Sequence, residues 1–473
     1  MSRKSLVALL AVAAVAAAGV LVLVRGLSSQ RDAASHQPTA EQTYFEWTTL
    51  PFEASELAGR RDRLQAALAA AGGGVFLAPA HSGASEGFTF RQLDDFYYFT
   101  GLEIPDAVLA IDADRGMSVI YAPRRDARFE NPSRANDFPG RPLADDPAIA
   151  RRAGIDIQPL DRLEPALAAL AAAGRAVRVN PGAPGPVPRP VLGLIQDWTP
   201  QVHFVAALRA GHPDLAIESA YDQVARLRMV KTAAEIERMR AAATIGADGI
   251  AHAAGFVVDG VDERGLEAEL EAHYKRHGAE RLPFASIIKS GPNALWPWRI
   301  LATHADRRNR QMHDGELVIF DVGCEIAGYT SDVGRTFPVS GRFTGEQREI
   351  LAMEVAVSDA IIAAMKPGVT LADIQRAGAA AIPPEHRPYM QTGLYFGHHI
   401  GLSSGDPFLP DAPLEPGMVI TVEPWYYNHD RGISVFTEDD VLITADGAEN
   451  LTGQLPRTPD ALERLAGVAA RRP

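Results

Sequence analysis

The sequence contains a single cysteine, Cys324, among its 473 residues. An intramolecular disulfide is therefore excluded, and so is a cysteine-rich zinc or iron–sulfur site. Basic residues are also in deficit, because 46 Lys and Arg stand against 59 Asp and Glu, which gives a formal net charge of −13. This deficit argues against affinity for phosphate backbones, so we expect no nucleic acid partner. Any metal ion must be held by carboxylates and imidazoles.

Long apolar runs are scarce too, apart from one at the N-terminus. The 20 residues 5–24 carry no charge and are rich in Leu, Val and Ala. That length is enough to cross a bilayer, which favours an uncleaved signal anchor over a cleaved signal peptide, and either of these over a buried core helix. We expect an N-terminal hydrophobic helix within residues 1–28, a tether at 29–44, and a protein that is membrane-anchored or exported, periplasmic or extracytoplasmic.

The remaining chain has the composition of a folded protein. It is 47% hydrophobic and 22% charged, which excludes wholesale disorder and, at this length, allows two or three domains. Within residues 45–215, short apolar runs at 107–111 and 118–121 predict strands. Ala-rich amphipathic stretches at 57–71 and 163–173 predict helices. This alternation indicates an α/β N-terminal domain.

A second domain is predicted over residues 216–465. Thr232 and Glu235 form a capping-box pattern, which predicts the start of a long helix. Further on, a Gly-Val pair precedes each of two helical stretches, 262–277 and 370–379. This repetition is weak evidence that the domain consists of two similar halves.

Two carboxylates belong to a predicted hairpin in the first of these halves. Residues 316–337 read as strand, turn and strand. We expect the turn to be centred between Ile326 and Ala327. Asp321 then lies directly opposite Asp332 on one face of the hairpin. Like charges in such positions are destabilising, so either a cation lies between them, or they share a proton, or the register differs from the one expected.

A second acidic pair follows the same plan. Strands predicted at 418–423 and 433–443 flank a turn that contains Asn, Asp and Gly. If the turn is centred between the two strands, Glu423 lies opposite Glu438. Glu423 follows Asp321 by 102 residues, close to the spacing of the two Gly-Val pairs. Each half thus supplies one acidic pair, and the two pairs could close around one site.

Four carboxylates with few Lys or Arg nearby cannot gather away from water unless divalent cations balance them. Two metal ions are the natural number, because a pair can share bridging carboxylates and lower the pKa of a shared water, which is hydrolytic chemistry. The competing interpretation is that each acid is a solvated hairpin residue. For one acid the two interpretations are balanced, whereas four acids in mirrored positions favour the metal site.

Two adjacent histidines lie in an apolar, glycine-bounded run that precedes the second acidic pair. Neighbouring residues of a strand point to opposite faces, so only one of His398 and His399 can face a shared site. A histidine in such a run is more often a core residue than a ligand, and only the nearby acids reverse this expectation.

These residues carry a family resemblance. Asp321, Asp332, His398, Glu423 and Glu438 match in order and type the five metal ligands of the pita-bread metallopeptidases, and the chain resembles their aminopeptidase P and Xaa-Pro dipeptidase (prolidase) branch. The motifs are Phe320-Asp-Val-Gly-Cys-Glu, Thr330-Ser-Asp-Val-Gly-Arg-Thr-Phe337, Gly397-His-His-Ile-Gly-Leu402, Glu415-Pro-Gly-Met-Val-Ile-Thr-Val-Glu423-Pro and Thr437-Glu-Asp-Asp-Val-Leu-Ile443. In the first domain, Phe90-Arg-Gln-Leu-Asp-Asp-Phe-Tyr-Tyr-Phe-Thr-Gly101 resembles the signature of the aminopeptidase P N-terminal domain. The similarity extends over about residues 45–460.

The resemblance implies an α/β N-terminal domain followed by an α+β pita-bread (creatinase/aminopeptidase) catalytic domain. It implies that Asp332 and Glu438 bridge two divalent metal ions. Asp321 completes the coordination of one ion, and His398 with Glu423 completes the coordination of the other. Family members most often use Mn²⁺, and others use Co²⁺ or Zn²⁺; oxygen-rich ligation with one imidazole suits manganese.

The resemblance also implies the reaction and the substrate, which is a peptide with proline at its second position. The N-terminal Xaa-Pro bond is hydrolysed, and Glu423 handles the proton. His304 resembles the family's histidine that contacts the substrate and the developing negative charge, so we expect it to be catalytic. Relatives are often dimers or tetramers, which makes a homo-oligomer the expectation.

Three positions depart from the family pattern. Gly405 stands where relatives carry a histidine, Phe436 where the branch commonly has an arginine, and Leu394 where many relatives have another histidine. Changes around an intact set of ligands can cost about 10 to 100-fold in metal affinity or activity. The alternatives to an aminopeptidase are therefore a dipeptide-only prolidase, a catalytically weak pita-bread protein that binds peptides, and a metal-free, creatinase-like hydrolase.

Overall fold

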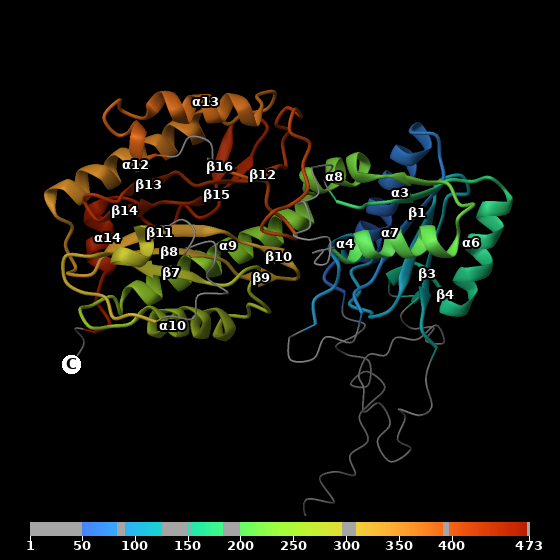
Figure 1. Cartoon of the computed structure of the whole chain (residues 1–473), viewed down its shortest axis with the longest axis horizontal. Helices are drawn as coiled ribbons and strands as arrows, with labels where there is room; N and C mark the ends of the chain where they lie inside the picture. Colours follow the sequence, from blue (N-terminus) through green and yellow to red (C-terminus); the bar gives the residue numbers. More distant parts are fainter. Residues whose placement is uncertain are drawn as a thin grey trace, which may run out of the picture. The chain divides into compact units, whose positions relative to one another are not determined.

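Two regions of regular structure follow one another along the chain (Figure 1). The structure, a computed structural model, describes residues 50–82, 90–124, 150–151, 153–182, 199–295, 309–390 and 397–470. The apolar run 5–24 lies outside these residues, so the hydrophobic helix expected there stays a prediction. Among the residues that are described, no helix is both long and apolar enough to cross a membrane.

The N-terminal region is built on a six-stranded mixed sheet with the strand order β4-β3-β2-β1-β5-β6. Its strands are β1 (Val75–Pro79), β2 (Val108–Asp112), β3 (Met117–Ala122), β4 (Asp156–Pro159), β5 (Val177–Val179) and β6 (Ile217–Ser219). The hairpin pairs β1–β2 and β2–β3 are antiparallel, and the pairs β3–β4, β1–β5 and β5–β6 are parallel.

Helices pack on both faces of this sheet, as the alternation of β1 requires. Phe76 belongs to one apolar cluster, together with residues of α3 (Ala54–Ala70) and α4 (Asp94–Thr100). Its neighbours Val75 and Leu77 belong to another, which includes residues of α6 (Leu163–Ala172) and α7 (Pro200–Gly211). The α/β arrangement expected from the sequence is confirmed, because the predicted strands and helices form β2, β3, α3 and α6.

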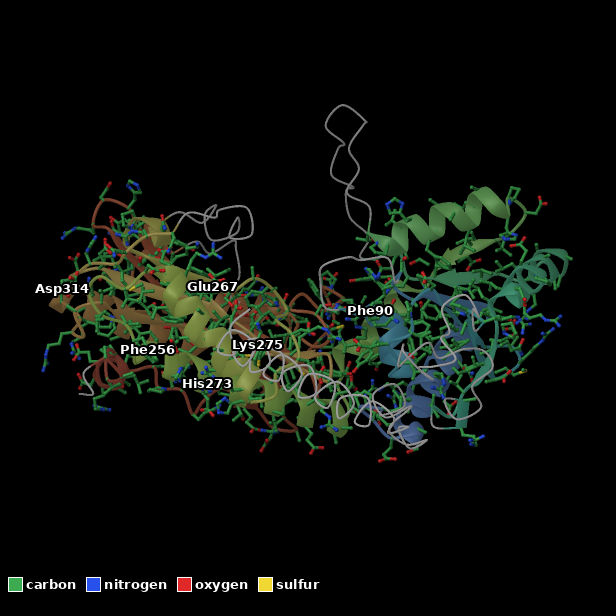
Figure 2. The ribbon with its side chains drawn as sticks, turned by 90° about the horizontal axis from the view of Figure 1, so that it is seen from below. Phe90, Phe256, Glu267, His273, Lys275 and Asp314 are labelled. Carbon is green, nitrogen blue, oxygen red and sulfur yellow. The ribbon has the colours of Figure 1, made fainter. Side chains whose placement is uncertain are left out.

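The helix α8 (Tyr221–Met229) leads into the C-terminal region, which contains two helix pairs. The first pair is α9 (Ala233–Ala254) and α10 (Glu263–Arg276), and the second is α12 (Gly345–Ala364) and α13 (Leu371–Ala381). Strands lie between the two pairs in Figure 1. Figure 2 marks α10 by Glu267, His273 and Lys275.

Local sequence explains where these helices begin. The capping box predicted at Thr232 and Glu235 is present, and Thr344 with Gln347 and Thr370 with Asp373 form two more. In each box two free backbone amides at the helix start find side-chain acceptors. The two Gly-Val pairs also share a backbone conformation, because both glycines have a positive φ, which is 84° at Gly260 and 90° at Gly368. The repeated design supports the hypothesis of two similar halves.

The strands of the C-terminal region form small antiparallel sheets, ordered β11-β8-β7, β12-β15-β16, β13-β14 and β10-β9. They are β7 (Ile287–Ser290), β8 (Leu317–Val322), β9 (Glu325–Ile326), β10 (Tyr329–Thr330), β11 (Val333–Pro338), β12 (Val419–Val422), β13 (Trp425–Asn428), β14 (Ile433–Phe436), β15 (Asp439–Ile443) and β16 (Ala448–Asn450). A last helix, α14 (Pro459–Leu465), follows them. An apolar cluster joins β8, β11, β12 and β15 to the helices on either side.

Candidate metal centre

The first acidic pair lies on the hairpin of β8 and β11. Asp321 pairs with Gly334, so the predicted pairing of Asp321 with Asp332 is wrong. The reason is the turn, where Ala327 and Gly328 have positive φ values of 52° and 77° and form the two-residue loop. An alanine rarely adopts this conformation, which is why the centre of the turn was expected one residue too early.

The second acidic pair lies on a hairpin whose predicted register is correct. Val422 pairs with Asp439 and Trp425 with Phe436, and this register places Glu423 opposite Glu438. The ladder is interrupted at these two acids, because β12 ends at Val422 and β14 ends at Phe436.

Gly334 joins the two hairpins at the level of the acids. It pairs with Asp321 on one side and forms a bridge to Glu438 on the other, with backbone hydrogen bonds of 3.2 and 2.9 Å between Gly334 and Glu438. A Cβ atom at Gly334 would lie 2.1 Å from the Phe436 ring. Only glycine therefore lets the hairpins approach this closely.

The two histidines point in different directions, as the alternation predicts. The Nε2 atom of His398 lies 3.2 Å from Oε1 of Glu423 and 3.8 Å from Oδ2 of Asp332. His399 is buried and stacks on Phe408, with a distance of 5.6 Å between the ring centroids. His398 is thus the histidine that joins the acids.

The residues expected to form the site gather from three separate stretches of chain, which are the two hairpins and the histidine pair. One ligand atom from each of Asp332, His398 and Glu438 lies within 4.8 Å of the others. Glu423 contacts His398, and Asp321 is near enough to Glu423 for their charges to interact. Among the described residues, no Lys or Arg forms an ion pair with any of the four acids.

The electrostatics of the cluster show how little positive charge it contains. Burial raises the pKa of Asp332 and of Glu438 well above the ordinary values, and the neighbouring acids add to this effect. Burial, followed by the Glu423 carboxylate, raises the pKa of Asp321 to about 8. The pKa of His398 is raised although burial opposes it, because the hydrogen bond with Glu423 favours the imidazolium.

Two residues that the sequence did not single out, Thr421 and Asp440, hold these groups in place. The Thr421 hydroxyl donates to Oε1 of Glu423 at 3.1 Å and accepts from the backbone N–H of His398 at 3.1 Å. Asp440 accepts from the backbone N–H of Asp332 at 3.2 Å. The position of Thr421, two residues before Glu423 on the same strand face, is the signal that could have identified it.

The departures from the family pattern have different structural outcomes. Phe436 is fully buried and stacks on Trp425 at 3.6 Å between centroids. A Cβ atom added at Gly405 would have no neighbour within 4 Å among the described residues. Leu394 and the expected catalytic residue His304 lie outside the described residues, so the role of His304 stays a prediction.

The donor set fits divalent cations. It consists of carboxylate oxygens and one imidazole nitrogen, the ligands that Mn²⁺, Co²⁺ and Zn²⁺ accept. Two buried oxygens, Oδ1 of Asp332 and Oε2 of Glu438, have no hydrogen-bond partner among the described residues. Buried carboxylate oxygens are normally paired, so these two are the atoms at which a cation is best accommodated.

Comparison with known proteins follows the same division of the chain. Residues 57–177 match the model of the aminopeptidase P N-terminal domain, and residues 237–445 match that of metallopeptidase family M24. The matches fall within the two expected domains, whose boundaries at 45–215 and 216–465 stay predictions.

Individual relatives resemble the chain over most of their length. It is 30% identical over 447 residues to the Xaa-Pro aminopeptidase of Escherichia coli K12, covering 84% of this chain and 94% of the relative. The structure of Pseudomonas aeruginosa aminopeptidase PepP superposes with a TM-score of 0.72 at 26% identity, covering 90% of this chain and all of that one. The structure of aminopeptidase P from E. coli with the inhibitor Pro-Leu superposes with a TM-score of 0.70 at 26% sequence identity. The superposition covers 89% of this chain and 100% of that one.

Proposed function

The chain belongs to the Xaa-Pro aminopeptidase family of M24 metallopeptidases, and from this premise we propose how its buried residues perform the reaction. It is a metal-dependent aminopeptidase that hydrolyses the N-terminal Xaa-Pro bond of peptides. The observation that supports our assignment of the site is the gathering of four acids and one imidazole without a Lys or Arg partner among the described residues.

We propose that two divalent cations, Mn²⁺ in the first place, are held by Asp321, Asp332, His398, Glu423 and Glu438. Asp332 and Glu438 are the residues best placed to be shared, because each contributes to the cluster from one hairpin and each has an unpaired buried oxygen. When bound, such cations polarise the scissile carbonyl and lower the pKa of water.

Side chains of the protein then accept and transfer the proton that is released during hydrolysis. We assign the proton transfer to Oε2 or Oε1 of Glu423, which are oriented by the indole N–H of Trp425 at 3.4 Å and by the Thr421 hydroxyl at 3.1 Å. A carboxylate fixed by two donors keeps its geometry while it accepts and returns a proton. His304 is proposed to contact the substrate, as the family resemblance implies.

The experiment is a metal analysis combined with a peptide series on the purified full chain. We expect about two ions per chain, cleavage of a Xaa-Pro-Xaa tripeptide, and much slower cleavage of a tripeptide with alanine in the second position. Hydrolysis of the Xaa-Pro dipeptide alone would establish the prolidase alternative. Absence of bound metal after incubation with Mn²⁺ would favour the weak peptide-binding protein.

The location of the enzyme is a separate proposal, based on the apolar run 5–24 alone. We propose that this segment anchors the protein or directs its export. Deleting residues 1–28 should release the enzyme from the membrane fraction and leave kcat unchanged. Unchanged membrane association after the deletion would contradict the proposal.

A further inference from the structure

A hydrogen bond at the far side of the His398 ring determines how the ring is presented. Its Nδ1 atom lies 3.2 Å from the carbonyl oxygen of His399. A carbonyl can only accept, so in the neutral ring Nδ1 carries the hydrogen and Nε2 is left with the lone pair. Whatever fixes the His399 carbonyl therefore fixes both the tautomer and the direction of His398.

The His399 carbonyl is held by the loop that follows it, residues 401–406. The backbone N–H of Asp406 donates to this carbonyl at 3.0 Å. Asp406 is buried, and its carboxylate lies so near Gly401 that a Cβ atom there would be 2.4 Å from Oδ2. The position of Asp406 is thus the one that closes the loop onto the histidine pair.

Asp406 is in turn held by two buried cations that precede α9. Arg228 of α8 forms an ion pair with Oδ1 of Asp406, and Lys231 with Oδ2 at 3.2 Å. The same guanidinium reaches Asp94 at 2.9 Å and Asp95 at 3.0 Å, both on α4 of the N-terminal region. One arginine therefore connects α4 to the loop 401–406.

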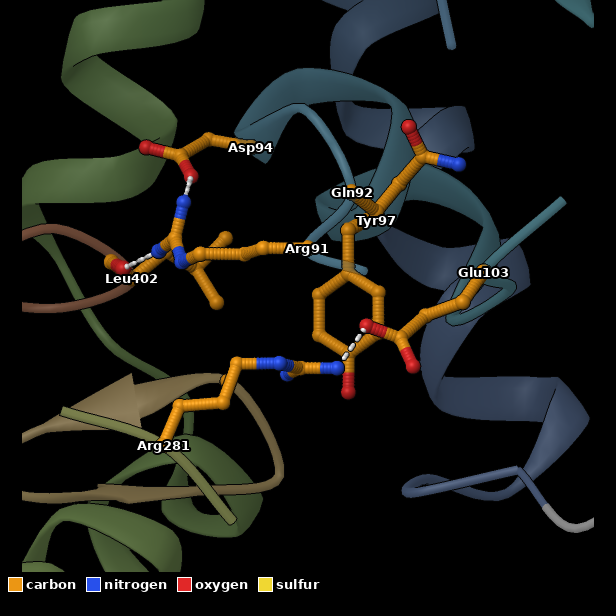
Figure 3. Close-up of a pocket in the computed structure, with 8 residues that line it drawn as sticks. Arg91, Gln92, Asp94, Tyr97, Glu103, Arg281 and Leu402 are labelled. Carbon is orange, nitrogen blue, oxygen red and sulfur yellow. Dashed lines mark hydrogen bonds and ion pairs between the residues drawn. The ribbon is translucent and has the colours of Figure 1, made fainter. Parts of the chain in front are cut away.

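The N-terminal region also contacts the loop directly. Arg91 donates to the carbonyl oxygen of Leu402, and the Ser403 hydroxyl donates to Oδ2 of Asp94. Figure 3 shows Arg91 between Asp94, with which it pairs at 2.8 Å, and Leu402. Segment 91–95, part of the N-terminal signature, thus holds the loop at two points beyond the Arg228 ion pairs.

We propose that Asp94 and Asp406 are positioning residues for the metal centre. Together with Arg91 and Arg228 they fix the loop 401–406, the loop fixes the His399 carbonyl, and the carbonyl orients His398. The N-terminal domain then serves metal binding as well as its own fold. The proposal rests on the proposed role of His398 as a ligand.

The same interface supplies a matched control. The Tyr97 hydroxyl, also on α4, donates to the carbonyl oxygen of Ala327 at 3.0 Å. This bond connects the N-terminal region to the turn between β9 and β10 and does not touch the loop. Replacing Tyr97 by Phe removes a hydrogen bond between the same two regions without disturbing the orientation of His398.

The test measures Mn²⁺ affinity by titration calorimetry on the metal-depleted full chain in Ser403→Ala, Asp406→Asn, Tyr97→Phe and His398→Ala. We expect Ser403→Ala and Asp406→Asn to weaken one of the two Mn²⁺ sites, by about 10 to 100-fold for Asp406→Asn. Tyr97→Phe should leave both sites unchanged, and Ser403→Thr, which keeps the hydroxyl, should restore the affinity. Saturating Mn²⁺ should restore most of kcat in Ser403→Ala.

The outcomes separate this proposal from the assignment of the site. Unchanged Mn²⁺ affinity in His398→Ala would overturn the ligand role of His398, and with it the positioning role. A weakened site in His398→Ala, together with unchanged affinity in Ser403→Ala and Asp406→Asn, would overturn the positioning role alone. An equal loss in Tyr97→Phe would show that the contacts only stabilise the interface. If Asp406→Asn fails to fold, the comparison of Mn²⁺ affinity between Ser403→Ala and Ser403→Thr tests the positioning role alone.

Discussion

Two clusters of buried and half-buried carboxylates lie next to His398 and His399, and they differ in how much positive charge surrounds them. The acids of the candidate metal centre have a single imidazole among them, and burial with the neighbouring Glu423 charge raises the pKa of Asp321 to about 8. The other cluster, around Arg228, contains guanidinium and ammonium groups. There burial is outweighed by Arg228 and Arg91, which lower the pKa of Asp94 to about 2.

The difference in neighbouring positive charge distinguishes acids that stabilise the fold from acids that are available to bind a cation. A buried carboxylate with its own guanidinium is complete when the chain has folded. Asp439 shows the contrast between adjacent residues, because it pairs with Arg335 at 2.7 Å and both side chains are fully buried, whereas the Glu438 beside it has no cation from the described protein. A group of such acids gathered around an imidazole, and not a single one of them, is where metal ions should be sought.

The strongest way to break this comparison is to remove one charge from the candidate metal centre. Asp332→Asn or Glu438→Gln should reduce turnover to background and remove bound metal, because a neutral amide is a poor bridging ligand. Tripeptide hydrolysis and metal content measure the effect. Full activity in either variant would show that the site is misplaced.

Asp439→Asn is the matched control for that experiment. It removes the same charge one residue away, but from an acid paired with Arg335. We expect it to lower the melting temperature while two ions still bind. Loss of metal from a well-folded Asp439→Asn protein would contradict the separation between the two kinds of acid.

Removing the cation from the second cluster should cost stability. Arg228→Met leaves the buried Asp95 and Asp406 and the half-buried Asp94 with one cation fewer, and breaking such a group costs about 3 to 5 kcal/mol. Urea unfolding of the metal-depleted protein measures the loss. A change below about 1 kcal/mol, the range of exposed pairs, would mean that the cluster contributes little.

One buried acid that lies outside the candidate metal centre also lacks a cation partner among the described residues. It allows the comparison of paired and unpaired acids to be tested by the pH dependence of stability. This acid, Glu354 on α12, is fully buried, and burial raises its pKa well above the ordinary value although the Thr437 hydroxyl opposes this. The folded protein then binds this proton more tightly than the unfolded chain does. Its stabilising contribution is present below the unfolded pKa, about 4.3, and is lost as pH rises toward the folded pKa.

Glu354→Met should therefore be increasingly stabilising relative to the unmodified chain as pH rises from 5 to 8. The difference grows by at most about 1.4 kcal/mol per pH unit. Melting temperatures of both proteins across this range provide the measurement. A difference that stays constant with pH would show that Glu354 does not change its protonation on unfolding.

The smallest effect is expected two residues from Arg228, on the same helix. Arg226 pairs with Glu415 at 3.3 Å, and both side chains are largely exposed. Arg226→Met should change the free energy of unfolding by less than about 1 kcal/mol, and added salt should reduce the effect further. A loss as large as that of Arg228→Met would remove the distinction between buried and exposed pairs.

Local rules were enough to predict much of this fold. The capping box at Thr232 and the strand alternation placed α9 and the N-terminal sheet. The two-residue repeat of a strand indicated that only one of His398 and His399 faces the acids, and the family resemblance selected His398. The register of the second hairpin was also correct, because its turn contains the residues that such turns require.

Contacts between distant segments could not be predicted in the same way. The ion pairs of Arg228 join residues 133 and 178 positions away, and no periodicity in the sequence indicates which charges will meet. The predicted register of the first hairpin was wrong for a local reason, which is the positive φ of Ala327 in the turn. The resemblance identified the acids of the site, but only coordinates could show that Arg335 neutralises Asp439 and that no comparable pair among the described residues involves Glu438.

The division of the acids between two hairpins has a consequence for how the enzyme matures. Ribosomes deliver the chain from its N-terminus, so Asp321 and Asp332 are made well before His398, Glu423 and Glu438. The nascent first half carries an acidic pair with nothing to complete it, and Gly334 has no Glu438 to bridge. The cations we propose can be captured only after the second hairpin has closed, which makes loading a late step of biosynthesis.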